Sequence, residues 1–300
     1  MDGFLAVDKP RGWTSHDVVD RVRSILSIKK VGHTGTLDLM ATGVLVLCLG
    51  RLTRLSSFLT VQDKGYHAKI WLGVSTNTLD SEGRVTARSD RVPRDPEEIR
   101  KTIEGFVGQN RQTPPMFSAR KISGRRLYRW AREDKEIARP SQIVNFYSIQ
   151  IAQFDPPFLD LDVSCSKGTY IRVLAEDIGR ELRCGGHLAG LRRTGVGSIG
   201  LDQCIAMDKV GEEGWEHHLI DPNRALGHLP LLRLAPEEAR RFTHGNSISG
   251  LRPDMELDAE RSIRVADVEG RLLGIGKWQM EDLVLKPIRV LRPYKPEMAV

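Results

Sequence analysis

The apolar residues of this chain occur in short runs, and the longest uninterrupted one is Val44–Leu49. A membrane-spanning helix needs about 20 consecutive apolar residues, so this run is far too short to form one. Short apolar runs separated by glycine, proline and charged residues are typical of the strands and amphipathic helices of globular proteins. The chain has 300 residues, which suffice for about two domains and for a core without disulfides. We therefore expect a globular protein that does not enter a membrane.

The cysteines and the N-terminus indicate the compartment. The cysteines show no CxxC or paired spacing and are Cys48, Cys165, Cys184 and Cys204. Free thiols of this kind are typical of a reducing environment. The first residues, Met1-Asp2-Gly3-Phe4, lack the basic flank of a secretory signal. We therefore expect a cytoplasmic protein.

Local patterns predict the main elements. Runs rich in apolar or β-branched residues predict strands at 4–7, 44–49, 66–72, 143–154 and 158–165. Capping residues and apolar periodicity predict helices after Thr14 or Ser15, over 52–59, after Asp95-Pro96, and over Tyr170–Leu182 with Thr169 as its cap. The glycine-rich stretch 32–43 predicts a long loop before the strand at 44–49.

The pattern changes toward the C-terminus. Polarity rises over residues 208–222, which suggests a linker. From about Leu229 the chain consists of short segments separated by turns, with strands expected at 262–265, 272–276 and 283–291. The sequence therefore predicts one domain over 1–222 and a small β-rich domain over 229–300.

The net positive charge is concentrated in one segment. The chain carries 45 Lys and Arg against 39 Asp and Glu, a formal charge of +6. The stretch 111–135 holds eight bases and two acids, so it accounts for the whole surplus. It also carries Tyr128 and Trp130, and prolines at 114–115 and 140 flank it, which predicts an insertion at about 111–140. Cations beside aromatic rings suit a nucleic-acid surface, although a solvated charged helix face fits the charge equally well.

The loop Gly32–Asp38 is the best candidate for chemistry, because it places an imidazole and a carboxylate on a glycine-rich turn. A phosphate-binding Walker loop would need a lysine that is missing here. A metal site would need a third ligand beside His33 and Asp38 at a recognisable spacing. Asp38 could act as a nucleophile or a base, or it could simply cap the turn as many loop aspartates do.

Three further residues have side chains suited to such a site. Arg172 lies one turn inside a predicted helix, where it could orient and keep ionised a catalytic carboxylate. Tyr66 follows a polar turn and could stack on a base or move a proton. Leu191 precedes two arginines and could form an apolar floor. Taken singly, each also fits an ordinary structural role.

Together these motifs resemble the TruB family of tRNA pseudouridine synthases, over nearly the whole chain and in order. The matching motifs are Asp8-Lys9-Pro10 with Gly12, 32–38 followed by 41–45, Tyr66, 76–80 with Gly83, 114–115, 117–119, Lys121, Gly124, 127–128, Lys167-Gly168-Thr169-Tyr170-Ile171-Arg172 and 191–193. Residues 274–276 and 285–287 are similar to the PUA-type RNA-binding module that ends many such proteins. The resemblance implies an α+β pseudouridine synthase fold, with a mixed, mainly antiparallel central sheet flanked by helices, and a small PUA-like domain.

The resemblance also implies the reaction and the site residues. Uridine at position 55 in the T loop of tRNA would be isomerised to pseudouridine without cofactor or metal. Asp38 would be the catalytic aspartate, with attack at C6, attack at C1′ and glycal formation all open as its chemical path. Arg172 would pair with Asp38, and Tyr66 would stack on the flipped base and act as the general base. Asp80 would have a supporting role.

The resemblance assigns the remaining residues to substrate binding. Tyr170 and Leu191 would line the base pocket, and His33 would fill the gap that the flipped base leaves. The basic insertion would close on the T stem-loop as the thumb of the family, with contacts from Arg120, Lys121, Arg125, Arg126 and Arg129. The partner is then tRNA, and we expect a monomer with no obligatory protein partner.

One departure from the family pattern follows the aspartate. The family usually has proline and then leucine there, whereas this chain has Leu39-Met40. Loss of proline could loosen the loop and lower the rate without removing a reacting group. Three alternatives stay open: a guide-RNA-dependent synthase, a non-catalytic RNA-binding protein or tRNA-folding chaperone, and a phosphate-loop NTPase.

Overall fold

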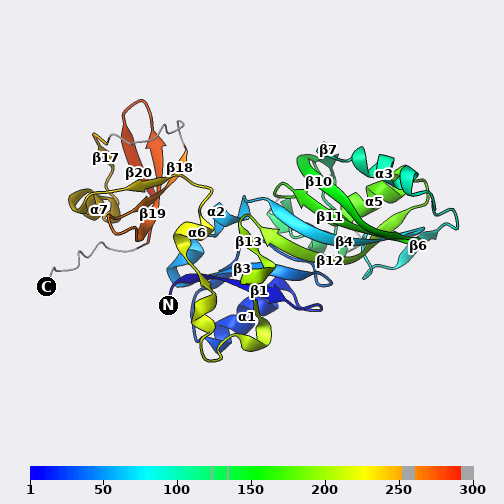
Figure 1. Ribbon diagram of the computed structural model, residues 1–300, viewed down its shortest axis with the longest axis horizontal. Coiled ribbons are helices and arrows are strands. Elements are labelled where there is room, and N and C mark those ends of the chain that lie inside the picture. Colours follow the sequence, from blue (N-terminus) through cyan, green and yellow to red (C-terminus); the bar gives the residue numbers. More distant parts are fainter. Residues whose placement is uncertain (123, 134, 252–260, 292–300) are drawn as a thin grey trace.

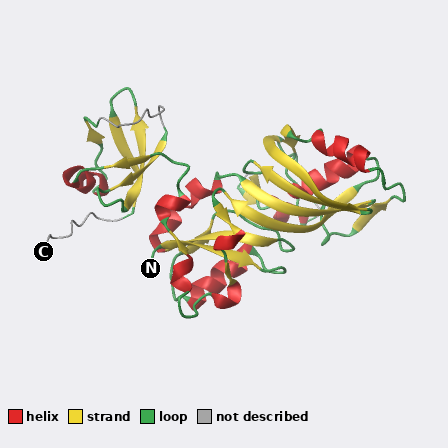
Figure 2. Cartoon of the chain, viewed as in Figure 1, coloured by secondary structure: helices red, strands yellow, loops and turns green. Residues whose placement is uncertain are grey.

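The computed structural model of the chain describes residues 1–122, 124–133, 135–251 and 261–291. A large twisted sheet runs through the main body, and a smaller sheet lies beyond it on the side of the C-terminus (Figure 1; Figure 2). Parts of the predicted C-terminal domain, at 252–260 and 292–300, lie outside the described residues. Among the described residues no helix is long and apolar enough to cross a membrane.

The large sheet follows the order β14-β1-β3-β12-β4-β11-β10-β7. Its strands are β1 (Gly3–Lys9), β3 (Thr42–Leu49), β4 (Lys64–Leu72), β7 (Gly108–Gln112), β10 (Gln142–Asp155), β11 (Phe158–Cys165), β12 (Gly186–Val196) and β14 (Ile205–Ala206). Strands β2 (Val31–His33), β13 (Ile199–Gly200) and β15 (Leu219–Ile220) pair with β3, β12 and β1. The β1–β14 and β12–β3 pairs are parallel and the others antiparallel, so the prediction of a mixed, mainly antiparallel sheet is confirmed.

Helices cover the two halves of this sheet. The main ones are α1 (Ser15–Ile25), α2 (Ser56–Thr60), α3 (Pro96–Glu104) and α5 (Ile171–Glu181), and the 3₁₀ turn η1 (Gly50–Leu55) precedes α2. Helix α1 has the capping box expected from its sequence, because the Thr14 hydroxyl and the Asp17 carboxylate each accept the other's backbone N–H. Helix α3 begins after Asp95, whose carboxylate accepts from the Glu97 N–H. The predicted helix positions are therefore confirmed.

Two sequence predictions near the site need correction. Thr169 does not cap α5: its hydroxyl donates to the Ser166 carbonyl at 2.8 Å, and Tyr170 occupies the cap position without a side-chain hydrogen bond. The predicted loop 32–43 is shorter than expected, because Val31–His33 pairs with β3 as strand β2. Only residues 34–41 form the connection, so Asp38 lies on a compact loop held at both ends by strands.

The basic segment projects from the far edge of the sheet between β7 and β10. We call residues 113–141 the thumb; its described elements are β8 (Lys121–Ile122), β9 (Arg125–Arg126) and α4 (Leu127–Ala131). Arg111 lies in β7, where it pairs with Ile143 of β10. The projecting part therefore begins after Gln112 rather than at Arg111, because backbone pairing keeps Arg111 in the sheet.

The stretch 208–222 is not an extended linker. It contains η3 (Met207–Lys209), η4 (Trp215–His218) and β15, and it follows η2 (Leu201–Gln203) and β14. Trp215 is buried in the core beneath α1, and Leu219 pairs with Leu5 of β1. Backbone pairing and one buried tryptophan thus fix a segment whose polar composition suggested a linker.

The small sheet has the order β16-β18-β19-β20-β17, so the expected β-rich C-terminal part is present. Its elements are β16 (Leu231–Arg233), α7 (Pro236–Thr243), β17 (Ile248–Ser249), β18 (Ser262–Ala266), β19 (Leu272–Gln279) and β20 (Val284–Val290). Helix α6 (Pro222–Ala225) precedes them and packs on the main body, where Ala225 shares a core cluster with Phe4. The C-terminal part touches the main body through Arg51, whose Nη1 donates to the Leu291 carbonyl at 3.1 Å. The domain division at 222 and 229 stays a prediction.

Candidate active site

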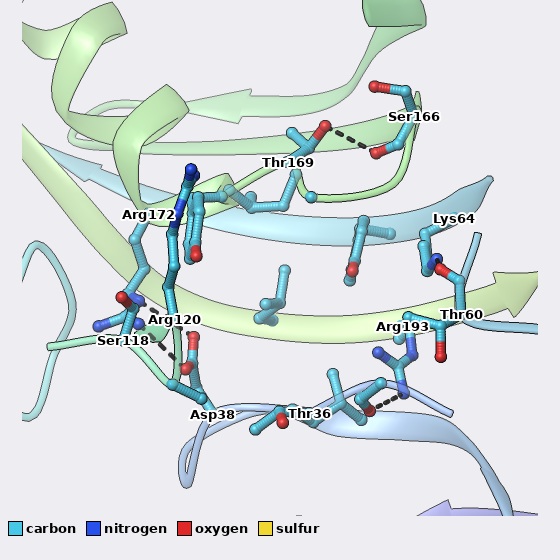
Figure 3. Close-up of a pocket in the computed structure, with 18 of the residues that line it drawn as sticks. Thr36, Asp38, Thr60, Lys64, Ser118, Arg120, Ser166, Thr169, Arg172 and Arg193 are labelled. Atoms are coloured by element: carbon cyan, nitrogen blue, oxygen red, sulfur yellow. Dashed lines mark hydrogen bonds and ion pairs between the residues drawn. The ribbon is translucent and has the colours of Figure 1, made fainter. Parts of the chain in front are cut away.

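A cavity of about 260 Å³ opens between the 34–41 loop, strands β4 and β12, and the N-terminus of α5. Its volume lies near the lower end of the range for ligand pockets, about 300 Å³. Polar side chains line two ends of it (Figure 3). Asp38, Arg172, Ser118 and Arg120 lie at one end, and Lys64, Thr60 and Arg193 lie at the other. The sequence candidates from distant parts of the chain therefore meet at one place.

Asp38 and Arg172 form a two-point ion pair. Arg172 Nε lies 3.0 Å from Asp38 Oδ2, and Arg172 Nη2 donates to Asp38 Oδ1 at 3.0 Å. The Arg172 side chain is 5% exposed, whereas that of Asp38 is 35% exposed. A guanidinium fork fixes both the position and the plane of a carboxylate. The pair predicted from sequence is present, and its carboxylate faces the cavity.

The other donors of Arg172 are also occupied. Its Nη1 donates to Asp80 Oδ2 at 3.2 Å and to the Thr78 carbonyl at 3.3 Å, and Nη2 donates in addition to the Phe117 carbonyl at 2.8 Å. Asp80 is itself fixed by the Thr78 hydroxyl and by the Glu82 N–H. Because both Nη groups donate two hydrogen bonds each and Nε lies against Asp38 Oδ2, the guanidinium cannot rotate without losing contacts.

Two opposing effects set the protonation of Asp38. Burial raises the pKa of the Asp38 carboxyl above its ordinary value, and the Arg172 guanidinium opposes that shift. The loop beyond it is held by Lys9, a fully buried residue whose Nζ donates to the carbonyls of Pro10, Trp13 and Leu39. Desolvation lowers the pKa of Lys9 to about 8. The carboxylate thus lies on a loop anchored at the following residue.

Tyr66 and Arg193 form the opposite wall. They are register partners across β4 and β12, and Leu191 lies two residues before Arg193 on the same strand. Arg193 Nε donates to the Val44 carbonyl at 2.7 Å and Nη2 to the Gly35 carbonyl at 3.2 Å. Burial raises the pKa of the Tyr66 phenol, so it is protonated at neutral pH. Tyr66 and Leu191 both line the cavity.

Tyr170 and His33 lie at the rim of this arrangement. Tyr170 lines the cavity, and its backbone is held by the Gln112 side chain. His33 lies at the end of β2, immediately before the cavity-lining loop. Burial, together with the positive charge of Arg193, lowers the pKa of His33, and its buried Nδ1 has no hydrogen-bond partner among the described residues. A neutral imidazole with a free ring nitrogen therefore lies beside the cavity.

The predicted thumb residues occupy different environments. Arg120 lines the cavity and donates to the Gln142 side chain, whereas Lys121 is exposed on β8. Arg125 is engaged within the thumb: it pairs with Glu133 and stacks on Trp130, with 4.1 Å from its guanidinium carbon to the ring centroid.

Arg126 and Arg129 flank Tyr128 instead. Hydrogen bonds from Arg129 and then Arg126 lower the pKa of the Tyr128 phenol. In the thumb, Arg125 therefore stabilises the local fold, whereas Arg126 and Arg129 are exposed beside Tyr128.

Several residues of the site were missed or underestimated from sequence. Arg193 and Lys64 are buried polar groups that the sequence analysis did not assign to the site, although Leu191, two residues before Arg193 on the same strand, was assigned to it. Asp80 was given only a supporting role, yet it shares Arg172 with Asp38. The hydroxyls of Thr34 and Ser118 line the cavity and have no hydrogen-bond partner among the described residues. An unpaired buried hydroxyl is costly unless a ligand pairs with it.

Family models match the chain in three consecutive stretches. Residues 23–171 match the TruB family pseudouridylate synthase (N terminal domain). Residues 172–231 match the tRNA pseudouridylate synthase B C-terminal domain, and residues 230–291 match Pseudouridine synthase II TruB, C-terminal. The first two stretches contain every residue that lines the cavity, whereas strand β1 and Lys9, which anchors the catalytic loop, lie before them.

Relatives and solved structures agree with these matches. The chain is 41% identical over 306 residues to tRNA pseudouridine synthase B of Ralstonia pickettii (strain 12J), covering 97% of this chain and 94% of the relative. It is 42% identical over 280 residues to tRNA pseudouridine synthase B of Dechloromonas aromatica (strain RCB), covering 92% of this chain and 91% of that relative.

A chain in the crystal structure of a Cbf5-Nop10-Gar1 complex shares the fold, with a TM-score of 0.74 at 24% identity, covering 97% of this chain and 85% of that one. The fold is thus that of the pseudouridine synthases, as the motifs implied. Sequence identity over nearly the full length settles the family. The chain belongs to the TruB family of pseudouridine synthases.

Proposed function

We propose that this protein isomerises uridine to pseudouridine in tRNA, at position 55 in the T loop, with Asp38 as the catalytic carboxylate. The observation that carries this proposal is the two-point pair of Asp38 with the buried Arg172 at the mouth of a nucleoside-sized cavity. The net reaction breaks the bond from C1′ to N1, forms a bond from C1′ to C5, and moves one proton from C5 to N1. It therefore needs no external oxidant or reductant.

The cavity explains how the base is brought to the carboxylate. A uridine in a folded loop must leave its stack to reach an enclosed pocket, at a cost of a few kcal/mol. Tyr66 and Leu191 supply an aromatic face and an apolar floor for it. His33 has a neutral ring that can stack where the base departed. These contacts offset the cost of extruding the base.

Proton transfer requires a second group beside the carboxylate. The Tyr66 phenol faces the cavity from the wall opposite Asp38, with the Arg193 guanidinium beside it. The phenol, which is protonated at rest, would give its proton to N1 and then, as an anion stabilised by the Arg193 cation, accept the C5 proton, so that it returns to its starting form. Tyr66 is therefore our candidate for the general base that completes the isomerisation.

The thumb supports the choice of a stand-alone enzyme. Arg126, Arg129 and Lys121 place positive charge on the thumb, whose residues 118–120 line the cavity, as a substrate-binding surface for the T stem-loop requires. A guide-dependent synthase would obtain such contacts from a guide RNA and partner proteins. We therefore propose a monomer that binds tRNA without an obligatory protein partner, in the cytoplasm.

The test is the modification of an unmodified tRNA transcript by the pure protein, with the modified position mapped. Pseudouridine at position 55 without added guide RNA is the expected result. Product that appears only with guide RNA and partner proteins would favour the guide-dependent alternative. Asp38→Asn should bind tRNA within a few fold of the wild type and form no product. Unchanged product in this variant would refute the role of Asp38, and absence of product in the wild type would favour a non-catalytic RNA chaperone.

A further inference from the structure

Two glutamines lie where the thumb leaves the central sheet. Gln112 is the last residue of β7, Gln142 is the first residue of β10, and the two are register partners across that strand pair. The thumb consists of the residues between them. The thumb is therefore joined to the sheet at these two residues, and a movement of the thumb relative to the sheet displaces the chain there.

Each glutamine side chain holds the backbone that leads into α5. The Gln112 side chain pairs with the Tyr170 peptide groups: its Oε1 accepts the N–H at 3.0 Å, and its Nε2 donates to the carbonyl at 3.2 Å. Gln142 Nε2 donates to the Gly168 carbonyl at 2.7 Å. Gln112 is only 2% exposed, so water cannot readily replace its contacts. The two strand positions at which the thumb begins and ends are therefore both hydrogen-bonded to the segment 168–170, which ends two residues before Arg172.

The thumb itself adds two contacts that reach the same segment. Arg120 Nη1 donates to Gln142 Oε1, so this glutamine bridges the thumb and Gly168. Arg172 Nη2 donates both to the Phe117 carbonyl, at 2.8 Å, and to Asp38. Two continuous chains of hydrogen bonds therefore run from the thumb, one to the cavity wall and one to the carboxylate.

We propose that Gln112 and Gln142 are positioning residues that couple the placement of the thumb on RNA to the geometry of Asp38 and Arg172. The glutamines line neither the cavity nor the exposed thumb surface. A displacement of the thumb would act through the segment 168–172 on the ion pair of Arg172 with Asp38, which is already formed in this structure. The inference rests on the proposed function, since it takes Asp38 as the reacting group and the thumb as an RNA contact.

The test compares Gln112→Met and Gln142→Met, which keep side-chain length and lose both hydrogen-bonding groups. Two exposed glutamines on the same strands supply matched controls, Gln109→Met on β7 and Gln150→Met on β10. The rate constant is measured in a single turnover at saturating tRNA, and the tRNA dissociation constant is measured at the same salt concentration. Each site variant should lower the rate by about tenfold, the equivalent of about 1.4 kcal/mol, with the dissociation constant changed less than about twofold.

A double-mutant cycle and hydrogen exchange separate coupling from simple support of the fold. Arg120→Met and Gln142→Met should be non-additive in the single-turnover rate, because they break the same bridge. In the wild type, tRNA should slow amide exchange both in the thumb and in the segment 166–172. In the double variant Gln112→Met/Gln142→Met, tRNA should still slow amide exchange in the thumb but should no longer slow it in the segment 166–172.

Three outcomes would overturn the proposal. The first is a rate at saturation that equals that of the wild type, and the second is additive effects in the cycle. The third is protection of 166–172 by tRNA that survives both substitutions. A wild-type protein that forms no pseudouridine would instead refute the proposed function. The exchange experiment would still report whether the thumb and the segment 166–172 are coupled.

Discussion

Arg172 contacts both carboxylate oxygens of Asp38. Its Nη groups also donate hydrogen bonds to Asp80 and to two backbone carbonyls. The arginine comes from the first turn of a helix, and the two carboxylates come from loops that precede it by 134 and 92 positions in sequence. This relationship turns an aspartate on a surface loop into a carboxylate of fixed orientation.

Replacing Arg172 by lysine should lower the single-turnover rate about 100-fold or more. Lysine keeps the charge, but a single ammonium group cannot reach both Asp38 oxygens, Asp80 and the carbonyls together. Two lost charge-assisted hydrogen bonds correspond to about 3 kcal/mol. The control is Arg180→Lys, an exposed residue of the same helix that pairs with Asp177. A rate within a few fold of the wild type would show that charge alone suffices.

The rate should fall as the pH is lowered, over a range that lies above the ordinary aspartate pKa of 3.8. Burial raises the pKa of Asp38, so the reactive carboxylate is lost by protonation at a higher pH than in a free aspartate. The measurement is kcat/KM for pseudouridine formation against pH, within the range where tRNA and protein stay folded. A value of kcat/KM that is independent of pH down to 3.8 would contradict this protonation behaviour.

Substitution of Arg126 and Arg129 by alanine should reduce the salt dependence of tRNA binding. Each lost phosphate contact should lower the slope of log K against log salt by about 0.7 to 0.9. These two were chosen because Arg125 is engaged with Glu133 and Trp130 inside the thumb. The matched control is Arg88→Ala with Arg91→Ala, both exposed and outside the thumb. Equal slopes in the two double variants would mean that Arg126 and Arg129 face water and make no contact with tRNA phosphates.

Gly43→Ala should destabilise the protein far more than Gly108→Ala. Both glycines have a left-handed φ, +97° and +98°, so the backbone cost of alanine is similar. A Cβ on Gly43 would lie 2.2 Å from the Arg193 carbonyl oxygen, whereas one on Gly108 would meet nothing within 4 Å. We expect an additional loss of about 2 kcal/mol in the free energy of unfolding, measured by urea denaturation. Equal losses would show that β3 and β12 can separate there without cost.

Leu39→Pro should be tolerated and should make the catalytic loop slightly more rigid. The Leu39 carbonyl accepts from the Gly12 N–H at 2.9 Å, and proline would keep that carbonyl. A proline compatible with the native backbone stabilises by about 0.4 to 1 kcal/mol through the unfolded state. Thermal unfolding and the single-turnover rate are the measurements, and Val61→Pro, which removes an N–H that donates to the Leu59 carbonyl at the end of α2, should destabilise the protein instead. A large loss of stability in Leu39→Pro would mean that the catalytic loop does not suit proline.

Some elements followed directly from local sequence. The capping box at Thr14, the Asp95-Pro96 start of α3 and the strand Phe158–Cys165 all depend on residues next to one another in the chain. The cap predicted at Thr169 was wrong because the Thr169 hydroxyl donates to the Ser166 carbonyl instead. The linker expected at 208–222 was wrong because a distant partner, strand β1, pairs with Leu219.

The motifs of the sequence determined the family, the candidate carboxylate and the residues that could serve it, because residue types at fixed spacing carry that information. Only the tertiary structure decided which groups share a site. It placed Asp80 on the far side of Arg172, Arg193 across from Tyr66, and the two glutamines beneath the thumb. These contacts join strands and loops far apart in the chain, and the pairing of the central sheet sets their geometry, which no local pattern of residues encodes.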